Sequence, residues 1–230
     1  MKYFIFLLLL VLTGCGRTDE RIVNGAPPAR HATGKLIPID FKDSLYYDLA
    51  SYARDTVTND GWKISYLVKD DTTRYNDLYI QWEKGTLKRV YKDSDVLQMR
   101  RYFIPDLSKE NKTHIFLEHA CATGCWAVLV LPKDTSAEVK DFEAVFDYNT
   151  DLGQVVYRKY DQNDALAVSA TDLNRGSTKS VTYKNKGYAL GSDMAPLDTV
   201  IFKGDRIIID CEVYDLQQDK NIIERQVIRF

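Results

Sequence analysis

The sequence has few of the residues from which most catalytic and metal centres are built. Its 230 residues include 4 Cys and 3 His. It contains no Gly-x-Ser-x-Gly, P-loop, His-Glu-x-x-His or dinucleotide-binding motif. Charge of one sign is also missing, because Lys+Arg 31 stand against Asp+Glu 33. Without a basic excess we expect no nucleic-acid partner, and the missing motifs predict no cofactor and lower the expectation of an enzyme.

Long hydrophobic runs are equally scarce. The only one is Tyr3–Leu12, which follows the basic start Met1-Lys2. Ten residues span about half of a hydrocarbon core that is about 30 Å thick, so a membrane-crossing helix is a poor interpretation. A basic start followed by a short apolar run is the layout of a secretory signal peptide, which is removed from the mature protein.

The run ends in Leu12-Thr13-Gly14-Cys15, which resembles the lipobox of bacterial lipoproteins. The resemblance implies that Cys15 carries a diacylglycerol thioether and an N-acyl chain such as palmitate, and becomes the mature N-terminus. Several acyl chains give stable membrane anchoring, whereas one binds only marginally. Gly16 stands where an Asp would favour retention in the inner membrane, so the outer membrane is favoured. The alternative is an ordinary signal peptide with a cysteine near its cleavage site.

The resemblance covers only the first fifteen residues, and no family resemblance extends to the remainder. The composition, with 45% hydrophobic and 28% charged residues, is that of an ordinary globular protein. We therefore expect a signal peptide at residues 1–14, a lipidated tether at 15–35 and a single domain at 36–230. The tether has no periodic apolar signal and includes Gly25-Ala26-Pro27-Pro28.

The domain is predicted to be mainly β, with one short N-terminal helix. Apolar residues recur at helical spacing within Phe41–Val57, behind a possible cap at Ser44 and before Asn59-Asp60-Gly61. From Trp62 onward, short β-branched and aromatic runs alternate with turn residues, as strands and hairpins do. The expected strands are Trp62–Lys69, Asp77–Glu83, Thr86–Tyr91, Gln98–Phe103, Thr113–His119, Trp126–Leu131, Phe142–Asp147, Gln154–Tyr160, Ala165–Asp172, Thr178–Tyr183, Thr199–Lys203, Asp205–Leu216 and Asn221–Arg229.

Two connections carry a clear hairpin signal, because Gly85 and Gly204 stand where a tight turn needs positive φ. A weak self-similarity links Val168–Leu173 to Cys211–Leu216, and each of these segments ends in Asp-Leu. Their separation of 43 residues suits one four-stranded propeller blade, although two units do not establish a repeat. Antiparallel hairpins arranged as propeller-like blades, a β-sandwich or a barrel all remain open.

The densest cluster of reactive residue types lies between His114 and Trp126. A disulfide between Cys121 and Cys125 is our preferred prediction, because three residues with a Gly can form a hairpin turn and thiols oxidise outside the cytoplasm. The alternative is a thiol or zinc site at His119, Cys121 and Cys125. Cys211, on the apolar side of an alternating run, is predicted to be a buried, inert thiol, with pairing to Cys121 or Cys125 left open.

Two further groups are candidates for a site. Asp141, Glu143 and Asp147 could share one face of a strand, and a glycosidase needs two carboxylates at a suitable separation. Aromatic rings can stack on sugars, although in β proteins they mostly fill cores. The candidate aromatic residues for a ligand platform are Trp62, Tyr66, Tyr79 and Trp82.

These observations favour a lipid-anchored protein of the bacterial cell envelope that acts as a non-catalytic binding or assembly module. Its partners would be the membrane, through Cys15, and another envelope protein or a glycan. The alternatives are an envelope hydrolase with paired carboxylates, or the thiol or metal site described above.

Overall fold

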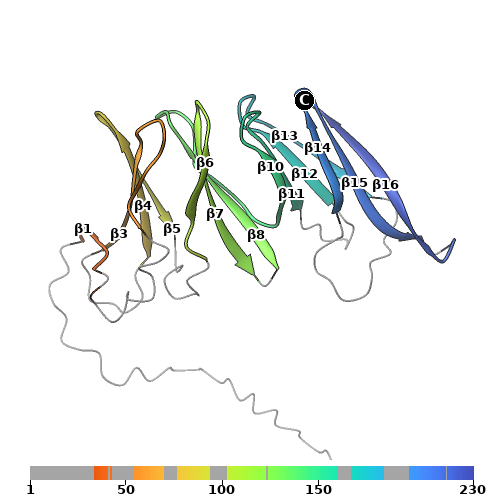
Figure 1. The fold of residues 1–230 in the computed structure, drawn as a ribbon, viewed down its shortest axis with the longest axis horizontal. Coiled ribbons are helices and arrows are strands. Elements are labelled where there is room, and N and C mark those ends of the chain that lie inside the picture. The colour runs from red at the N-terminus through yellow and green to blue at the C-terminus, as the bar shows by residue number, and fades with distance from the viewer. Residues whose placement is uncertain are drawn as a thin grey trace, which may run out of the picture.

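The computed structural model describes residues 34–40, 42, 54–69, 77–93, 103–122, 124–159, 167–183, 197–215 and 217–230. These residues form sixteen strands in four antiparallel sheets (Figure 1). The predicted mainly β fold of antiparallel hairpins is therefore confirmed. No helix in the described ranges is long and apolar enough to span a membrane.

Each sheet is built from consecutive strands, so the chain completes one sheet before it starts the next. Sheet A contains β1 (Leu36–Pro38), β2 (Thr56–Val57), β3 (Lys63–Lys69), β4 (Leu78–Lys84) and β5 (Leu87–Asp93). Sheet B contains β6 (Asp106–Glu110), β7 (His114–Ala122), β8 (Cys125–Pro132) and β9 (Lys140–Phe142). Sheet C contains β10 (Val145–Asn149), β11 (Gln154–Lys159), β12 (Ala167–Asp172) and β13 (Ser177–Thr182). Sheet D contains β14 (Leu197–Lys203), β15 (Arg206–Asp215) and β16 (Lys220–Arg229).

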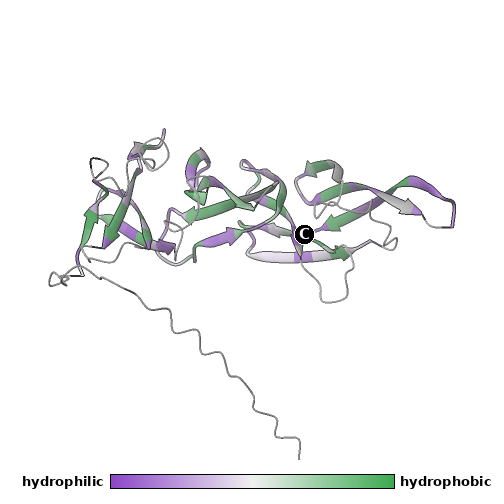
Figure 2. Ribbon diagram, turned by 90° about the horizontal axis from the view of Figure 1, so that it is seen from below, coloured by the Kyte–Doolittle hydropathy of each residue, from purple (hydrophilic) through white to green (hydrophobic). Residues whose placement is uncertain are grey.

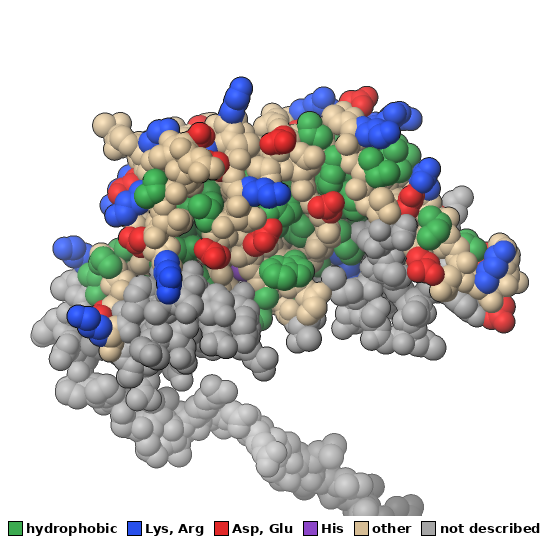
Figure 3. Space-filling model, in the orientation of Figure 1, with side chains coloured by type: hydrophobic (Ala, Val, Ile, Leu, Met, Phe, Trp, Pro, Cys, Tyr) green, Lys and Arg blue, Asp and Glu red, His purple; other side chains and the backbone are tan. Residues whose placement is uncertain are grey.

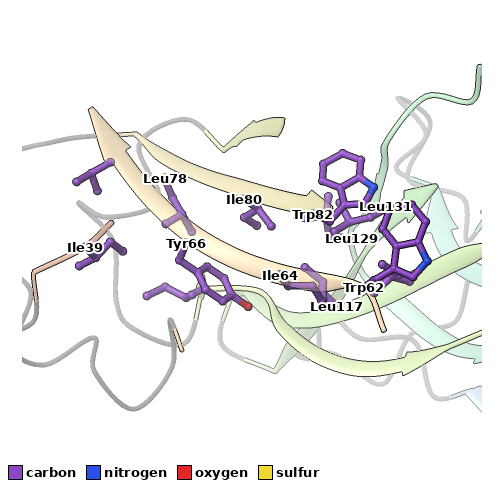
Figure 4. Close-up of a cluster of buried hydrophobic side chains, with 13 residues drawn as sticks. Ile39, Trp62, Ile64, Tyr66, Leu78, Ile80, Trp82, Leu117, Leu129 and Leu131 are labelled. Atoms are coloured by element: carbon purple, nitrogen blue, oxygen red, sulfur yellow. The ribbon is translucent and has the colours of Figure 1, made fainter. Parts of the chain in front are cut away.

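The four sheets stack face to face in an open row, with sheets A and D at opposite ends (Figure 1). Hydrophobic residues run along the strands of all four sheets (Figure 2). They form three buried clusters, one at each contact between neighbouring sheets. In the first cluster, side chains from β3 and β4 point toward Leu117, Leu129 and Leu131 of sheet B (Figure 4). Face-to-face packing of meander sheets is also how propeller blades pack, but here the row does not close into a ring.

Sheet B lies inside the row and is apolar on both faces. Ile115 and Leu117 of β7 pack against sheet A, whereas Phe116 between them packs against sheet C. Successive side chains of a strand point to opposite faces, so a strand buried on both sides reads as a continuous apolar run. This explains the unbroken Val128–Leu131 segment of β8.

Both predicted hairpin turns are present. Gly85 (φ 61°) joins β4 to β5 and Gly204 (φ 60°) joins β14 to β15. The related segments that begin at Val168 and Cys211 lie in β12 and β15 of consecutive sheets. The Asp172 carboxylate accepts a hydrogen bond from the backbone N–H of Arg175, and the Asp215 carboxylate accepts one from the backbone N–H of Gln217. The shared Asp therefore caps the turn that follows each strand.

Three sequence expectations need correction or fall outside the described residues. Phe142–Asp147 is not one strand, because β9 ends at Phe142 in sheet B and β10 starts at Val145 in sheet C, with Ala144 (φ 50°) between them. Most of the predicted strand Gln98–Phe103 lies outside the described residues. Most of the predicted helix Phe41–Val57 also lies outside them. The predicted C-terminal end of that helix is wrong, because Thr56–Val57 pairs with β3 as a strand.

Candidate binding site on the β7–β8 hairpin

The hairpin of β7 and β8 carries the cluster that the sequence singled out. Its turn is closed by a disulfide between Cys121 and Cys125, whose Cα atoms are 5.1 Å apart, as predicted. Gly124 in the turn has φ 73°, a conformation that favours glycine. The Ala144 amide donates a hydrogen bond to Cys121 Sγ at 3.5 Å. The disulfide therefore contacts the segment by which the chain passes from sheet B to sheet C.

The two faces of this hairpin carry different chemistry. Glu118, Trp126 and Val128 border a pocket shared with β10 of sheet C. His119 lies on the opposite face, which packs toward sheet A, because neighbouring residues of a strand point to opposite sides.

The pocket toward sheet C has a volume of about 230 Å³. Apart from the residues of the hairpin, it is lined by β10, including Asp147 and Tyr148. Trp126 is 60% exposed, although Trp residues are mostly buried in folded proteins. Elsewhere on the face of the row seen in Figure 3, acidic and basic side chains are interspersed. An exposed indole beside a hollow is a common feature of binding surfaces.

Glu118 is held in a fixed position in this pocket. Its Oε1 accepts hydrogen bonds from Tyr148 Oη at 2.5 Å and from Ser108 Oγ at 3.0 Å. Tyr148 in turn stacks on Phe116, with ring centroids 5.6 Å apart. Burial, together with the hydrogen bond to Glu118, raises the pKa of Tyr148 to about 12. The tyrosine therefore stays a hydrogen-bond donor to the carboxylate at every physiological pH.

On the opposite face His119 is the centre of a charged cluster. Its Nε2 is 3.2 Å from Asp141 Oδ1, and its Nδ1 is 3.1 Å from the Ala120 carbonyl oxygen. Burial opposes protonation, but the hydrogen bond and the charge of Asp141 outweigh it and raise the pKa of His119. At the end of β5, burial and the charge of Asp141 raise the pKa of Asp93 to about 6. We call His119, Asp141 and Asp93 the His119 cluster.

The thiol or metal site is not supported by this arrangement. The sulfur atoms of Cys121 and Cys125 are covalently bonded to each other, and the His119 ring is hydrogen-bonded to Asp141. In the part of the chain that the structure describes, no three His, Cys, Asp or Glu side chains are arranged to hold a metal ion. Cys211 is a buried thiol in the core between sheets C and D, as predicted, and burial raises its pKa to about 12.

The three candidate carboxylates do not share a face. Asp141 lies on β9 beside His119, Asp147 lies on β10 in the pocket, and Glu143 is exposed between the two strands. The expectation of a common face was wrong because β9 and β10 belong to different sheets. The pocket does hold two carboxylates, but the second is Glu118, whose role the sequence did not reveal.

The predicted aromatic platform is also contradicted. Its four side chains are at most 7% exposed and present no ring face to solvent. Trp82 Nε1 donates to the Pro132 carbonyl oxygen and Tyr66 Oη donates to the Pro105 carbonyl oxygen, so both rings connect sheet A to the segment that forms sheet B. The buried candidates are Trp62, Tyr66, Tyr79 and Trp82.

A second hollow, of about 420 Å³, lies among turns at Asn111, Thr113 and Asn174. The side-chain Nδ2 of Asn111 donates to the Thr150 carbonyl oxygen, and the side-chain Nδ2 of Asn174 donates to the Leu152 carbonyl oxygen. Because these side chains already bind neighbouring turns, we interpret this hollow as structural.

Comparisons of the chain with protein-family models, with curated protein sequences and with solved structures gave no match. The fold and the site define a class, namely a mainly β protein with an exposed tryptophan beside an acidic pocket. Any assignment of function depends on the residues of this site and on the N-terminal motif.

Proposed function

We propose that the protein is a lipid-anchored module of the bacterial cell envelope, held at the outer membrane, that binds a partner without converting it. The lipobox at Cys15 supports the address. The observation that carries the binding role is Trp126, which is exposed beside the pocket while Trp62 and Trp82 are buried. Covering such an indole on binding is favourable, and exposed aromatic anchors commonly dominate binding energy.

A co-sedimentation assay tests the binding role. Envelope fragments from the source cells are incubated with purified protein and pelleted, and bound protein is quantified. We expect Trp126→Ala to weaken the affinity by about thirtyfold or more, because losing an interface anchor costs about 2 kcal/mol or more. Val57→Ala is the matched control, since Val57 is 64% exposed on β2 of sheet A. Equal binding by both variants and the wild type would contradict the proposal.

An envelope hydrolase is the second candidate, and the His119 cluster favours it. The pKa of Asp93 is raised to about 6 by burial and by the charge of Asp141, and glycosidases use a carboxyl group with a raised pKa as their general acid. This hypothesis predicts that the protein releases soluble sugars from envelope glycans and that Asp93→Asn abolishes release. Trp126→Ala would weaken binding without abolishing turnover. No release of sugar by the wild-type protein would eliminate this candidate.

A further inference from the structure

The charged groups of the hairpin pocket are acidic. Glu118 and Asp147 line it, and no Lys, Arg or His is among the lining residues that the structure describes. Tyr148 donates its hydroxyl hydrogen to Glu118, which leaves the Trp126 indole N–H as the side-chain donor of the described lining. Asp147 Oδ1 accepts a hydrogen bond from the Tyr148 amide, which fixes the second carboxylate. The pocket therefore offers a ligand negative charge and hydrogen-bond acceptors.

The rest of the lining is apolar. Val128 of β8 and Val145 and Phe146 of β10 form the walls, and Trp126 stands at the same site with most of its surface exposed. An indole attracts a cation to its face, by about 0.5–1 kcal/mol at exposed sites and more when water is excluded. Apolar walls pack against the methylene stem of a long basic side chain while its charged end stays at polar groups.

From this arrangement, and building on the proposed binding function, we infer that the pocket receives a lysine or arginine side chain of a partner polypeptide. Glu118 and Asp147 accept the hydrogen bonds of the ammonium or guanidinium group, and Trp126 covers its stem. The two carboxylates supply the charge complementarity that selects a cation.

The size and polarity of the pocket argue against other ligands. Its volume of about 230 Å³ is below the roughly 300–1,000 Å³ of pockets that enclose drug-sized molecules, and it suits one side chain. A neutral sugar needs several donors as well as acceptors. Among the described lining residues the Tyr148 hydroxyl is already engaged, so the Trp126 indole N–H is the one side-chain donor left for it. An anion would be repelled by the two carboxylates.

Indole NMR of the full-length protein in detergent micelles tests the inference. The three tryptophans give three Nε1–H signals, and Trp82 Nε1 is bonded to the Pro132 carbonyl oxygen inside the core. The probe is a short lysine peptide, and the matched control is the same peptide with acetylated lysine side chains. We expect the lysine peptide to shift the Trp126 signal alone, with an affinity that falls as salt rises.

Two nearly isosteric variants test whether peptide binding needs the negative charges of the two pocket carboxylates. Glu118→Gln and Asp147→Asn should each weaken lysine-peptide binding by about tenfold while leaving the other indole signals unchanged. An absence of Trp126 shifts up to millimolar lysine peptide, or equal shifts with the acetylated peptide, overturns the inference. If the Trp126 signal instead moves with a neutral envelope oligosaccharide, the ligand class is wrong while the binding function stands. If it moves with neither and co-sedimentation is unaffected by Trp126→Ala, the binding function fails as well.

Discussion

At the residue scale, the His119 cluster links the stability of the fold to pH. Asp93 has a folded pKa of about 6, above its ordinary value of 3.8, so the folded state binds more protons than the unfolded chain between these values. The contribution of Asp93 to stability therefore falls as pH rises from about 4 to about 6. His119 also has a raised pKa, so its contribution is complete below its ordinary value of 6.5 and is lost as pH rises through the folded value.

Urea denaturation of wild type and variants from pH 4 to pH 8 measures both effects. We expect Asp93→Asn to remove the fall between pH 4 and 6 and to stabilise the protein at pH 7 by about 1–2 kcal/mol, after allowance for partial solvent screening. His119→Gln should remove the fall at higher pH. The two groups interact, so the transitions belong to the cluster as a whole. A wild-type stability curve that runs parallel to that of Asp93→Asn between pH 4 and 6 would contradict the account.

Lys133 is a second residue that contributes to the stability of the whole fold. Its buried Nζ donates to Asp60 Oδ2 and Glu110 Oε2, each at 2.6 Å, and to the Asn111 carbonyl oxygen at 2.5 Å. Asp60 lies in the turn between β2 and β3, and Glu110 ends β6, so Lys133 joins sheet A to sheet B. Burial would raise the pKa of Glu110, but hydrogen bonds from Lys133 and the Asp60 amide lower it.

We expect Lys133→Met to lower the free energy of unfolding by about 2–3 kcal/mol. This is less than for a fully buried pair, because Asp60 remains open to water. Lys63→Met is the control, since the Lys63–Asp55 pair is exposed and should contribute at most about 1 kcal/mol. Adding Glu110→Gln to Lys133→Met should recover part of the loss, because the unpaired buried charge disappears. Equal effects of the two lysine substitutions, by urea denaturation, would refute the role of Lys133.

At the element scale, the disulfide fixes the end of the β7–β8 hairpin that carries Trp126. A loop this short gives about 2 kcal/mol in the chain-entropy description. We expect Cys121→Ser with Cys125→Ser to lose about that much stability and to match the wild type measured in reductant. Acrylamide quenching of tryptophan fluorescence should also change, since Trp126 follows Cys125 and is the exposed indole. A change in quenching without loss of stability would show that the disulfide shapes only the site.

The elements also show what the sequence can and cannot predict. The sequence pattern predicts the strands that are rich in β-branched residues and the hairpin turns that contain glycine. It does not predict β6, whose sequence Asp106–Glu110 is polar. This edge strand is defined by its backbone pairing with β7 and carries no apolar pattern. The disulfide followed from local spacing. The pocket did not, because Glu118 and Tyr148 are 30 residues apart and meet only when sheets B and C stack.

At the scale of the whole molecule, the N-terminal motif Leu12-Thr13-Gly14-Cys15 predicts where the protein works. Cells expressing the protein are labelled with radioactive palmitate and fractionated. We expect the wild type to carry label and to sediment with outer membranes, because several acyl chains anchor stably. Cys15→Ser should carry no label and should leave the membrane fraction. Label retained by this variant would place the modification elsewhere, and an unlabelled wild type would favour an ordinary signal peptide.

The most direct test of the central claim is photo-crosslinking in intact cells. A benzophenone amino acid replaces Ala122 in one strain and Val57 in the other, because both side chains are exposed, Ala122 on the β7–β8 hairpin and Val57 in sheet A, and Trp126 stays in place. The account predicts that illumination joins position 122, and not position 57, to a discrete partner polypeptide, and that Glu118→Gln weakens this adduct. Adducts of equal yield from both positions, or from neither, would contradict a binding site on the β7–β8 hairpin.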